Sequence, residues 1–282
     1  MVFVIISILL FSFNNVLWKK NLQNINLFFL ISYRAFFTSF IAVCILIIYF
    51  DFSLLDFNSF LKITFGSLLG VIGLFSMLFV IKKTSLQWLG IYNLLGVVVT
   101  TIYLVIFEKV NISTSLNGII IIISGYLLFI FFNKETNFKL SLKYHLLLFC
   151  MVLSFSFSTI IHWRNLNNAI SPFFILANQE LLVFLVSSLF LFYYHRNKIL
   201  KSNYKSNFKN VLVMSVVIFF AILFSFIGVK KTDPLLTTVL FLASPLTTIL
   251  FSFLFFKEKI ILKNSIAIII ITVGAFVLHY KL

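Results

Sequence analysis

Three ionisable side chains interrupt long apolar stretches of the sequence, where a charge is costly and therefore informative. Arg34 is one of them, and an arginine at the centre of a membrane helix costs roughly 2.5–3.5 kcal/mol on insertion scales. Its guanidinium could attract an anionic group such as a carboxylate. Glu180 is the only acidic residue well inside an apolar stretch. A carboxyl group in such a low-dielectric site can carry a proton.

We interpret Arg34 and Glu180 as candidates for substrate binding, and Glu180 also as a candidate for proton coupling. His162 lies near the end of another apolar stretch and is a second candidate for proton coupling, because an unperturbed histidine titrates near neutral pH. The structural alternative is that Arg34 and Glu180 form an inert pair between helices. For His162 the alternative is that it faces water at a helix end.

Amide and aromatic side chains accompany these charges in the apolar stretches. Amides in hydrocarbon need hydrogen-bond partners, and tryptophans near helix ends often form interfacial belts, so each could serve packing or anchoring alone. As a set they suit a cavity for a small amphipathic solute. The substrate-binding candidates are Asn14, Trp18, Trp88, Tyr92, His162, Trp163 and Asn178, with Asn15, Gln87, Asn93 and Gln179 as polar neighbours.

Signals for an enzyme are nearly absent. The three aspartates, Asp51, Asp56 and Asp233, lie outside the apolar stretches and are not clustered. Cys44 and Cys150 lie inside apolar stretches and have neither a disulfide framework nor a metal-ligand spacing. We find no nucleotide-binding loop, so transport would proceed by facilitation or ion coupling. The sequence predicts no enzyme activity, no cofactor and no metal.

The composition explains why these polar groups stand out. The chain is 62% hydrophobic and only 10% charged, whereas a soluble domain is about 45–50% apolar and about 25% charged. The formal charge of +15 could suggest a nucleic-acid partner. We reject that interpretation because the lysines lie at the ends of apolar stretches, where they anchor helices. The expected partners are membrane lipids and a small-molecule substrate.

Ten stretches are long enough to cross a bilayer as helices, which needs about 20 apolar residues each. Their lengths and their lack of alternation exclude a membrane β-barrel. We therefore predict an all-α membrane protein with ten transmembrane helices. The predicted spans are 2–18, 27–50, 62–81, 85–107, 115–132, 144–163, 171–194, 210–229, 234–256 and 261–280.

Landmarks recur along the chain in one order at shifts of about 144–150 residues, which indicates an internal repeat. The predicted halves are 1–137 and 138–282. Five helices per half is an odd number, so the second half enters the membrane inverted, and the substrate site is expected between the halves. The landmarks are KNLQN at 20–24 with RNLNN at 164–168, KKT at 82–84 and 230–232, Glu108 with Glu258, and Gly125 with Gly274. Aligning the two copies on these landmarks places Glu180 opposite Arg34 to within one residue.

These landmarks resemble the EamA-like ten-helix members of the drug/metabolite transporter superfamily. Pro245 occupies the position of a helix-nine proline that is common in that family, whereas helix four has Gly96 in that neighbourhood. The resemblance implies cytoplasmic termini. Most of the 22 Lys and Arg residues, however, follow odd-numbered spans, and the positive-inside rule then puts both termini outside. We leave the orientation open.

The combined prediction is a secondary transporter that exports small metabolites, such as amino acids or related amphipathic compounds, by alternating access. It would be a multi-pass protein of a cell membrane, the bacterial inner membrane. The alternatives are a membrane enzyme or lipid-carrier-handling protein, and a non-transporting sensor or assembly factor. Glu108 and Glu258, at helix ends beside Lys109, Lys257 and Lys259, are interpreted as structural. The sequence identifies no substrate, direction, coupling ion or oligomeric state.

Overall fold

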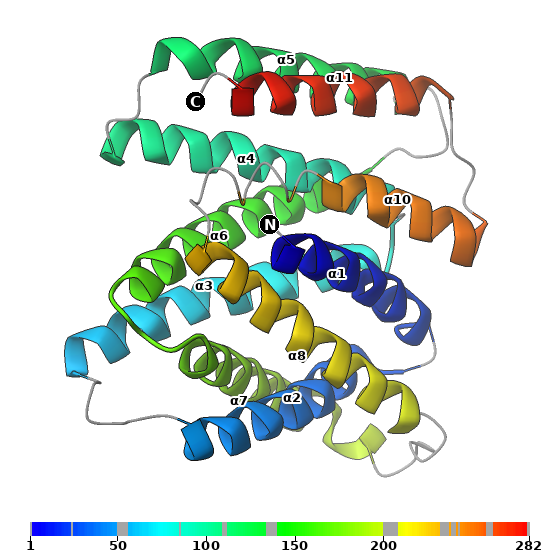
Figure 1. Ribbon diagram of the computed structural model, residues 1–282. Coiled ribbons are helices and arrows are strands. Elements are labelled where there is room, and N and C mark those ends of the chain that lie inside the picture. Colours follow the sequence, from blue (N-terminus) through cyan, green and yellow to red (C-terminus); the bar gives the residue numbers. More distant parts are fainter. Residues whose placement is uncertain are drawn as a thin grey trace.

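The computed structural model describes residues 2–23, 25–49, 56–84, 86–108, 112–133, 140–199, 208–231, 237, 241, 243–257 and 262–280. Within these ranges the elements are all helices (Figure 1). Their bounds are α1 (Val2–Asn21), α2 (Leu27–Tyr49), α3 (Phe57–Ile81), α4 (Leu86–Glu108), α5 (Ile112–Asn133), α6 (Leu142–Asn167), α7 (Pro172–Ile199), α8 (Phe208–Lys231), α10 (Ala243–Phe256) and α11 (Leu262–Tyr280).

Each of the ten predicted spans overlaps a described helix. Six of these helices, α1, α2, α3, α6, α7 and α8, are long and apolar enough to cross a membrane in the described part of the chain. Shorter apolar segments occur in α4, α5 and α11. The ninth predicted span, 234–256, overlaps α10, but most of residues 232–242 lie outside the described ranges. The chain is thus an all-helical multi-pass membrane protein.

Several helices extend beyond the predicted apolar spans because polar residues at their ends continue the helix. The prediction for α3 began at residue 62, whereas the helix begins at Phe57. Asp56 caps it, since its carboxylate accepts a hydrogen bond of 3.0 Å from the backbone N–H of Ser59. Hydrogen bonding of this carboxylate with Ser59 keeps the pKa of Asp56 below its ordinary value. α6 likewise continues to Asn167 instead of ending at residue 163.

The helices form a stacked arrangement in which neighbours come from distant parts of the sequence (Figure 1). α5 packs on α11 at one edge, and α4 packs on α10 next to them. In the middle, α1 packs on α8, and α3 packs on α6. α2 packs on α7 at the opposite edge. The fold therefore brings residues of the first 133 positions against residues beyond position 142 in every layer.

The α5–α11 contact is held close by two glycines. A Cβ atom on Gly125 would lie 2.6 Å from Cγ1 of Ile271, and one on Gly274 would lie 2.9 Å from the backbone nitrogen of Ile122. Real Cβ atoms essentially never come this near, so the two backbones could not approach as they do with larger residues. The two sequence landmarks thus have a packing role at the same helix crossing.

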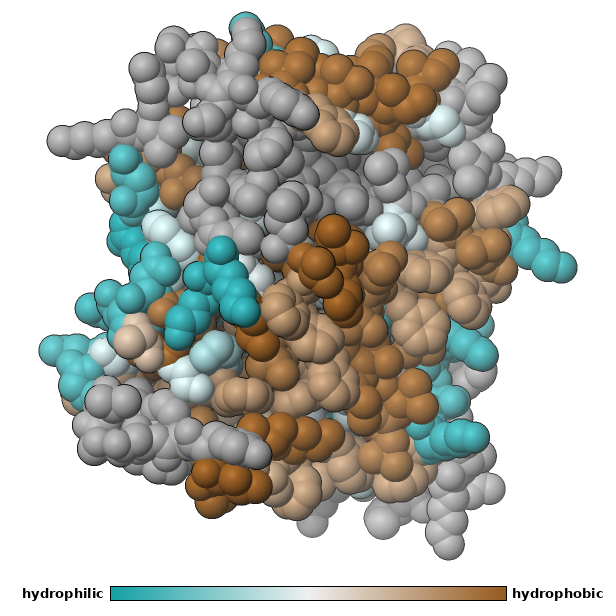
Figure 2. All heavy atoms as spheres, in the orientation of Figure 1, coloured by the Kyte–Doolittle hydropathy of each residue, from teal (hydrophilic) through white to brown (hydrophobic). Residues whose placement is uncertain are grey.

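The outer surface of the bundle is apolar over the span of the helices. Figure 2 shows hydrophobic residues across the middle of one face and hydrophilic residues towards its left and right sides. Side chains such as Phe40, Ile47, Leu189 and Phe192 are more than half exposed. Exposed apolar side chains on long apolar helices are expected where the surrounding solvent is lipid, and not water.

Candidate functional site

A cavity of about 270 Å³ lies in the interior, and we call it the central cavity. All the described helices except α5 and α11 contribute to its wall. Its volume is slightly below the 300–1,000 Å³ typical of sites for drug-sized ligands. Its polar and aromatic lining includes Asn14, Asn15, Trp18, Arg34, Asn93, Thr100, Ser156, Ser158, Thr159, His162, Gln179, Glu180, Ser225, Thr237 and Ser244.

Arg34 and Glu180 meet in this wall as a buried ion pair. Nη1 of Arg34 donates to Oε2 of Glu180, and the side chains are only 1% and 2% exposed. The Arg34 guanidinium also lies 5.6 Å from the ring centre of Trp18, which is a cation–π contact. Two opposite charges that neutralise each other can stay in an apolar interior, where either alone would be strongly unfavourable.

Hydroxyl groups fix the backbone that carries Arg34. Thr38, one turn later in α2, donates to the Arg34 carbonyl at 2.9 Å. Ser215 of α8 donates to the same carbonyl at 3.1 Å. Because helix α8 contributes one of these bonds, the position of Arg34 depends on the contact between α2 and α8.

Several polar atoms in the cavity wall have no hydrogen-bond partner in the described part of the chain. They are Nε of Arg34, Oδ1 of Asn14 and both ring nitrogens of His162. All three side chains are at most 2% exposed. Buried polar atoms normally have a partner, so a ligand or water could accept a hydrogen bond from Nε of Arg34 and donate one to Oδ1 of Asn14, and His162 could bond through either ring nitrogen.

The wall beside His162 is kept open for its ring by small residues. A Cβ on Gly66 would lie 2.9 Å from Cε1 of His162, and one on Gly70 would lie 3.2 Å from Nε2 of Gln179. Ser158 donates to the Gly66 carbonyl at 2.7 Å, which joins α6 to α3. The edge of the His162 ring faces Phe226, with ring centres 5.5 Å apart.

Part of this chain matches a known protein family. A profile of the EamA-like transporter family matches residues 142–280. This family is part of the drug/metabolite transporter superfamily, as the sequence landmarks predicted. The EamA-matched segment contains Glu180 and His162, whereas Asn14, Trp18 and Arg34 come from the part before it.

The fold of the whole chain also has a counterpart among solved structures. One of these, described only as the crystal structure of a protein, aligns with 99% of this chain and 96% of its own, with a TM-score of 0.75 and 15% sequence identity. At that identity the likeness concerns the fold alone. No curated protein matches the chain. The protein is therefore a multi-pass membrane protein in which residues 142–280 match the EamA-like transporter family.

The structure brings five of the predicted site residues together around the central cavity: Asn14, Trp18, Arg34, His162 and Glu180. Trp88 and Tyr92 lie elsewhere. The Tyr92 hydroxyl is 2.6 Å from Nδ1 of His145, and the ring of Trp88 meets that of Phe129 edge to face at 5.3 Å. Both belong to a packed cluster of α4, α5 and α6, and neither lines the cavity.

Trp163 and Asn178 also lie outside the cavity lining. Trp163 is partly buried and packs against hydrophobic residues around α7 and α8. Asn178 donates from Nδ2 to the Thr64 hydroxyl at 3.4 Å, while its Oδ1 has no partner in the described ranges. These contacts fit the packing alternative that the sequence left open for both residues.

The structure gives Glu108 a partner that the sequence did not suggest. Nη2 of Arg164 donates to Oε1 of Glu108 at 2.8 Å, and the side chains are 50% and 36% exposed. Glu258, Lys259 and Lys109 lie outside the described residues, as does the side chain of Gln87. The cavity lining also contains five residues that were not predicted from the sequence: Phe155, Ser156, Ser158, Phe226 and Ser244. The alternation of serines at 154, 156 and 158 in an apolar helix was the available signal.

Proposed function

We propose that the protein is a secondary transporter that exports small metabolites, such as amino acids or related amphipathic compounds. Transport would proceed by alternating access at the interface between two inverted five-helix halves, residues 1–137 and 138–282. The observation that carries the proposal is the central cavity, whose wall combines helices from both halves with the Arg34–Glu180 pair.

The proposed inverted repeat is supported by the pattern of helix contacts. Exchanging the halves would turn α1 into α6, α2 into α7, α3 into α8, α4 into α10 and α5 into α11. The contact of α1 with α8 then becomes that of α6 with α3, and both occur. The same holds for α1–α10 with α4–α6, and for α2–α8 with α3–α7. The pairs α2–α7, α4–α10 and α5–α11 map onto themselves.

Individual contacts repeat in the same reciprocal way. Gly125 meets Ile271, and its equivalent Gly274 meets Ile122. Ser12 donates to the Ser244 carbonyl at 3.3 Å, and the equivalent Ser156 donates to the Gly96 carbonyl at 3.5 Å. Reciprocal contacts of this kind are characteristic of two units related by a twofold axis.

The proposed repeat aligns Arg34 with Glu180 to within one residue, and these two side chains, 146 positions apart, contact each other. A residue that touches its own equivalent lies near the symmetry axis. The pair therefore joins the halves at the centre of the proposed transport path, where a substrate would meet both charges. A bound carboxylate would take the place of Glu180 on Arg34, and a bound ammonium would approach Glu180.

The substrate class follows from the sum of these groups. The Arg34–Glu180 pair contributes no net charge, which favours a solute that is neutral or zwitterionic. Asn14 and His162 add polar atoms that have no hydrogen-bond partner among the described residues, and Trp18 adds an aromatic surface. Glu180 and His162 are the groups through which proton movement could be coupled to transport.

Flux measurements in proteoliposomes test the proposal. We expect uptake or release of at least one member of a panel of amino acids and related zwitterions, and we expect Arg34→Ala and Glu180→Ala to abolish it. Lys62→Gln, which removes an exposed cation of α3, is the matched control and should transport normally. Absence of flux for the whole panel with folded protein would contradict the proposal.

One observation favours a second candidate, a non-transporting sensor or assembly factor. The Arg34–Glu180 pair is already closed, as expected for a purely structural pin. The two candidates differ in the double variant Arg34→Met with Glu180→Leu, because apolar residues of similar size often replace a buried ion pair without loss of stability. A sensor held together by the pair would keep its function in this variant, whereas a transporter would lose flux.

A further inference from the structure

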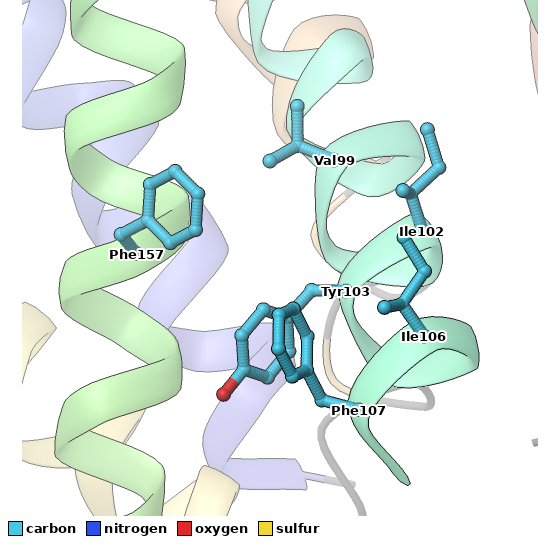
Figure 3. A pocket seen from close by; sticks show the side chains of 6 residues that line it. All are labelled: Val99, Ile102, Tyr103, Ile106, Phe107 and Phe157. Atoms are coloured by element: carbon cyan, nitrogen blue, oxygen red, sulfur yellow. The ribbon is translucent and has the colours of Figure 1, made fainter. Parts of the chain in front are cut away.

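A second hollow of the molecule lies on the outer side of α4 and α6, and we call it the α4–α6 groove. Five side chains of α4 and Phe157 of α6 line it (Figure 3). The α4 residues recur at three- and four-residue spacing, so they share one face of the helix. None of them lines the central cavity. The groove is formed by Val99, Ile102, Tyr103, Ile106, Phe107 and Phe157.

The groove faces the hydrocarbon region of the membrane. Ile106 and Phe107 are more than 60% exposed, although both belong to the apolar segment Leu95–Glu108. α6 is one of the six long apolar helices. The surrounding solvent of such a surface is lipid. A lipid acyl chain is therefore the chemistry that fits a concave apolar surface at this place.

One end of the groove has a pair of opposite charges. Glu108 directly follows Phe107 in α4, and Arg164 lies two helical turns beyond Phe157 in α6. Arg164 bonds Glu108 at 2.8 Å, and its guanidinium also lies 5.5 Å from the ring centre of Tyr103. Tyr103 thus connects the apolar groove with its charged end.

Both charged groups keep binding capacity beyond their mutual contact. A guanidinium has five N–H donors, and a carboxylate has about four acceptor sites. Arg164 is 50% exposed and Glu108 is 36% exposed, so both are accessible from outside. A ligand group that offers one negative and one positive charge would complement this end of the groove.

We propose that the α4–α6 groove binds a zwitterionic phospholipid whose head group carries a phosphate and a primary ammonium. Arg164 binds the phosphate, Glu108 accepts hydrogen bonds from the ammonium, and an acyl chain lies against Tyr103, Phe107 and Phe157. A lipid with only a negative head group would place that charge beside Glu108, which is unfavourable.

The first test uses the unaltered protein. We reconstitute it into nanodiscs of equimolar phosphatidylethanolamine, phosphatidylcholine and phosphatidylglycerol, release it into detergent, and count retained lipids by native mass spectrometry. We expect phosphatidylethanolamine to be retained about threefold over phosphatidylcholine, which has no ammonium N–H to donate, as partly exposed charge contacts are weak. Equal retention of the three lipids, or preference for phosphatidylglycerol, would overturn the proposal.

The second test separates the two charges. Arg164→Gln should lower retention of phosphatidylethanolamine and phosphatidylcholine alike, because both offer a phosphate. Glu108→Gln should remove only the preference between these two. Lys230→Gln, an exposed cation of α8 that is not part of the groove, is the control and should leave the retained lipids unchanged. Unchanged retention in both groove variants would also count against the site. If a variant fails to fold, the lipid retention measured on the unaltered protein still tests the proposal.

Discussion

Two arginine–glutamate pairs in this molecule have the same chemistry in different surroundings. Arg34 and Glu180 are 1% and 2% exposed and lie in the wall of the central cavity. Arg164 and Glu108 are 50% and 36% exposed and lie at the ends of α6 and α4. Each arginine also contacts an aromatic ring, Trp18 in one case and Tyr103 in the other. Solvent access is therefore the main variable between the two pairs.

The difference shows that burial decides how much an arginine–glutamate pair contributes to folding stability. In the interior, each partner depends on the other because the isolated charge would be left in a low-dielectric medium. At the exposed end, water and head groups can replace either partner, so the pair contributes little to folding. The buried pair should thus be sensitive to single changes, and the exposed pair should be tolerant of them.

The largest effect is expected for Arg34→Ala, which leaves Glu180 as a buried charge without its partner. Breaking a buried pair in this way destabilises by about 3–5 kcal/mol. Denaturant unfolding in detergent, followed by circular dichroism or tryptophan fluorescence, measures the change in free energy of unfolding. A loss as small as that for an exposed pair would break the comparison.

The double variant Arg34→Met with Glu180→Leu should sharpen the comparison, because it removes both charges together. We expect a stability within about 1 kcal/mol of the unaltered protein, or higher, as found when apolar residues replace buried pairs. Flux in proteoliposomes should be lost. Retained flux in a stable double variant would show that the pair serves only packing.

A smaller effect is expected for His162→Leu. Both ring nitrogens of His162 are buried without a partner in the described ranges. Replacing such a group by an apolar one of similar size should change stability by about 1 kcal/mol or less, since no hydrogen bond is lost. Flux should fall if His162 binds substrate or a proton. Thermal unfolding and proteoliposome flux of the same preparation separate the two outcomes.

The smallest effect is expected for Arg164→Gln in the exposed pair. An exposed ion pair contributes roughly 0.2–1 kcal/mol, and this contribution decreases further in 1 M salt. Unfolding curves at low and high salt should show this salt dependence in the unaltered protein and not in Arg164→Gln. A loss of stability comparable to that of Arg34→Ala would contradict the distinction between the pairs.

The helices were predictable because spanning segments must be long and apolar, and each of the ten predicted spans overlaps a described helix. Their ends were less predictable: capping by Asp56 extends α3 beyond its apolar segment. Three residues of the site were predictable as well. Arg34, Glu180 and His162 stand out as polar groups in apolar helices, and they do line the cavity.

Trp88 and Tyr92 share this aromatic and polar character but pack around His145 instead. Their position depends on which helix face meets α6, and the low amphipathicity of a membrane helix does not reveal that face.

The two glycines of the α5–α11 contact have a mechanical consequence. Because the backbones nearly touch at Gly125 and Gly274, sliding one helix along the other would drive isoleucine side chains into the opposing chain. Neither helix borders the central cavity. In the proposed transport cycle, we therefore expect this crossing to stay in register while the helices that line the cavity move.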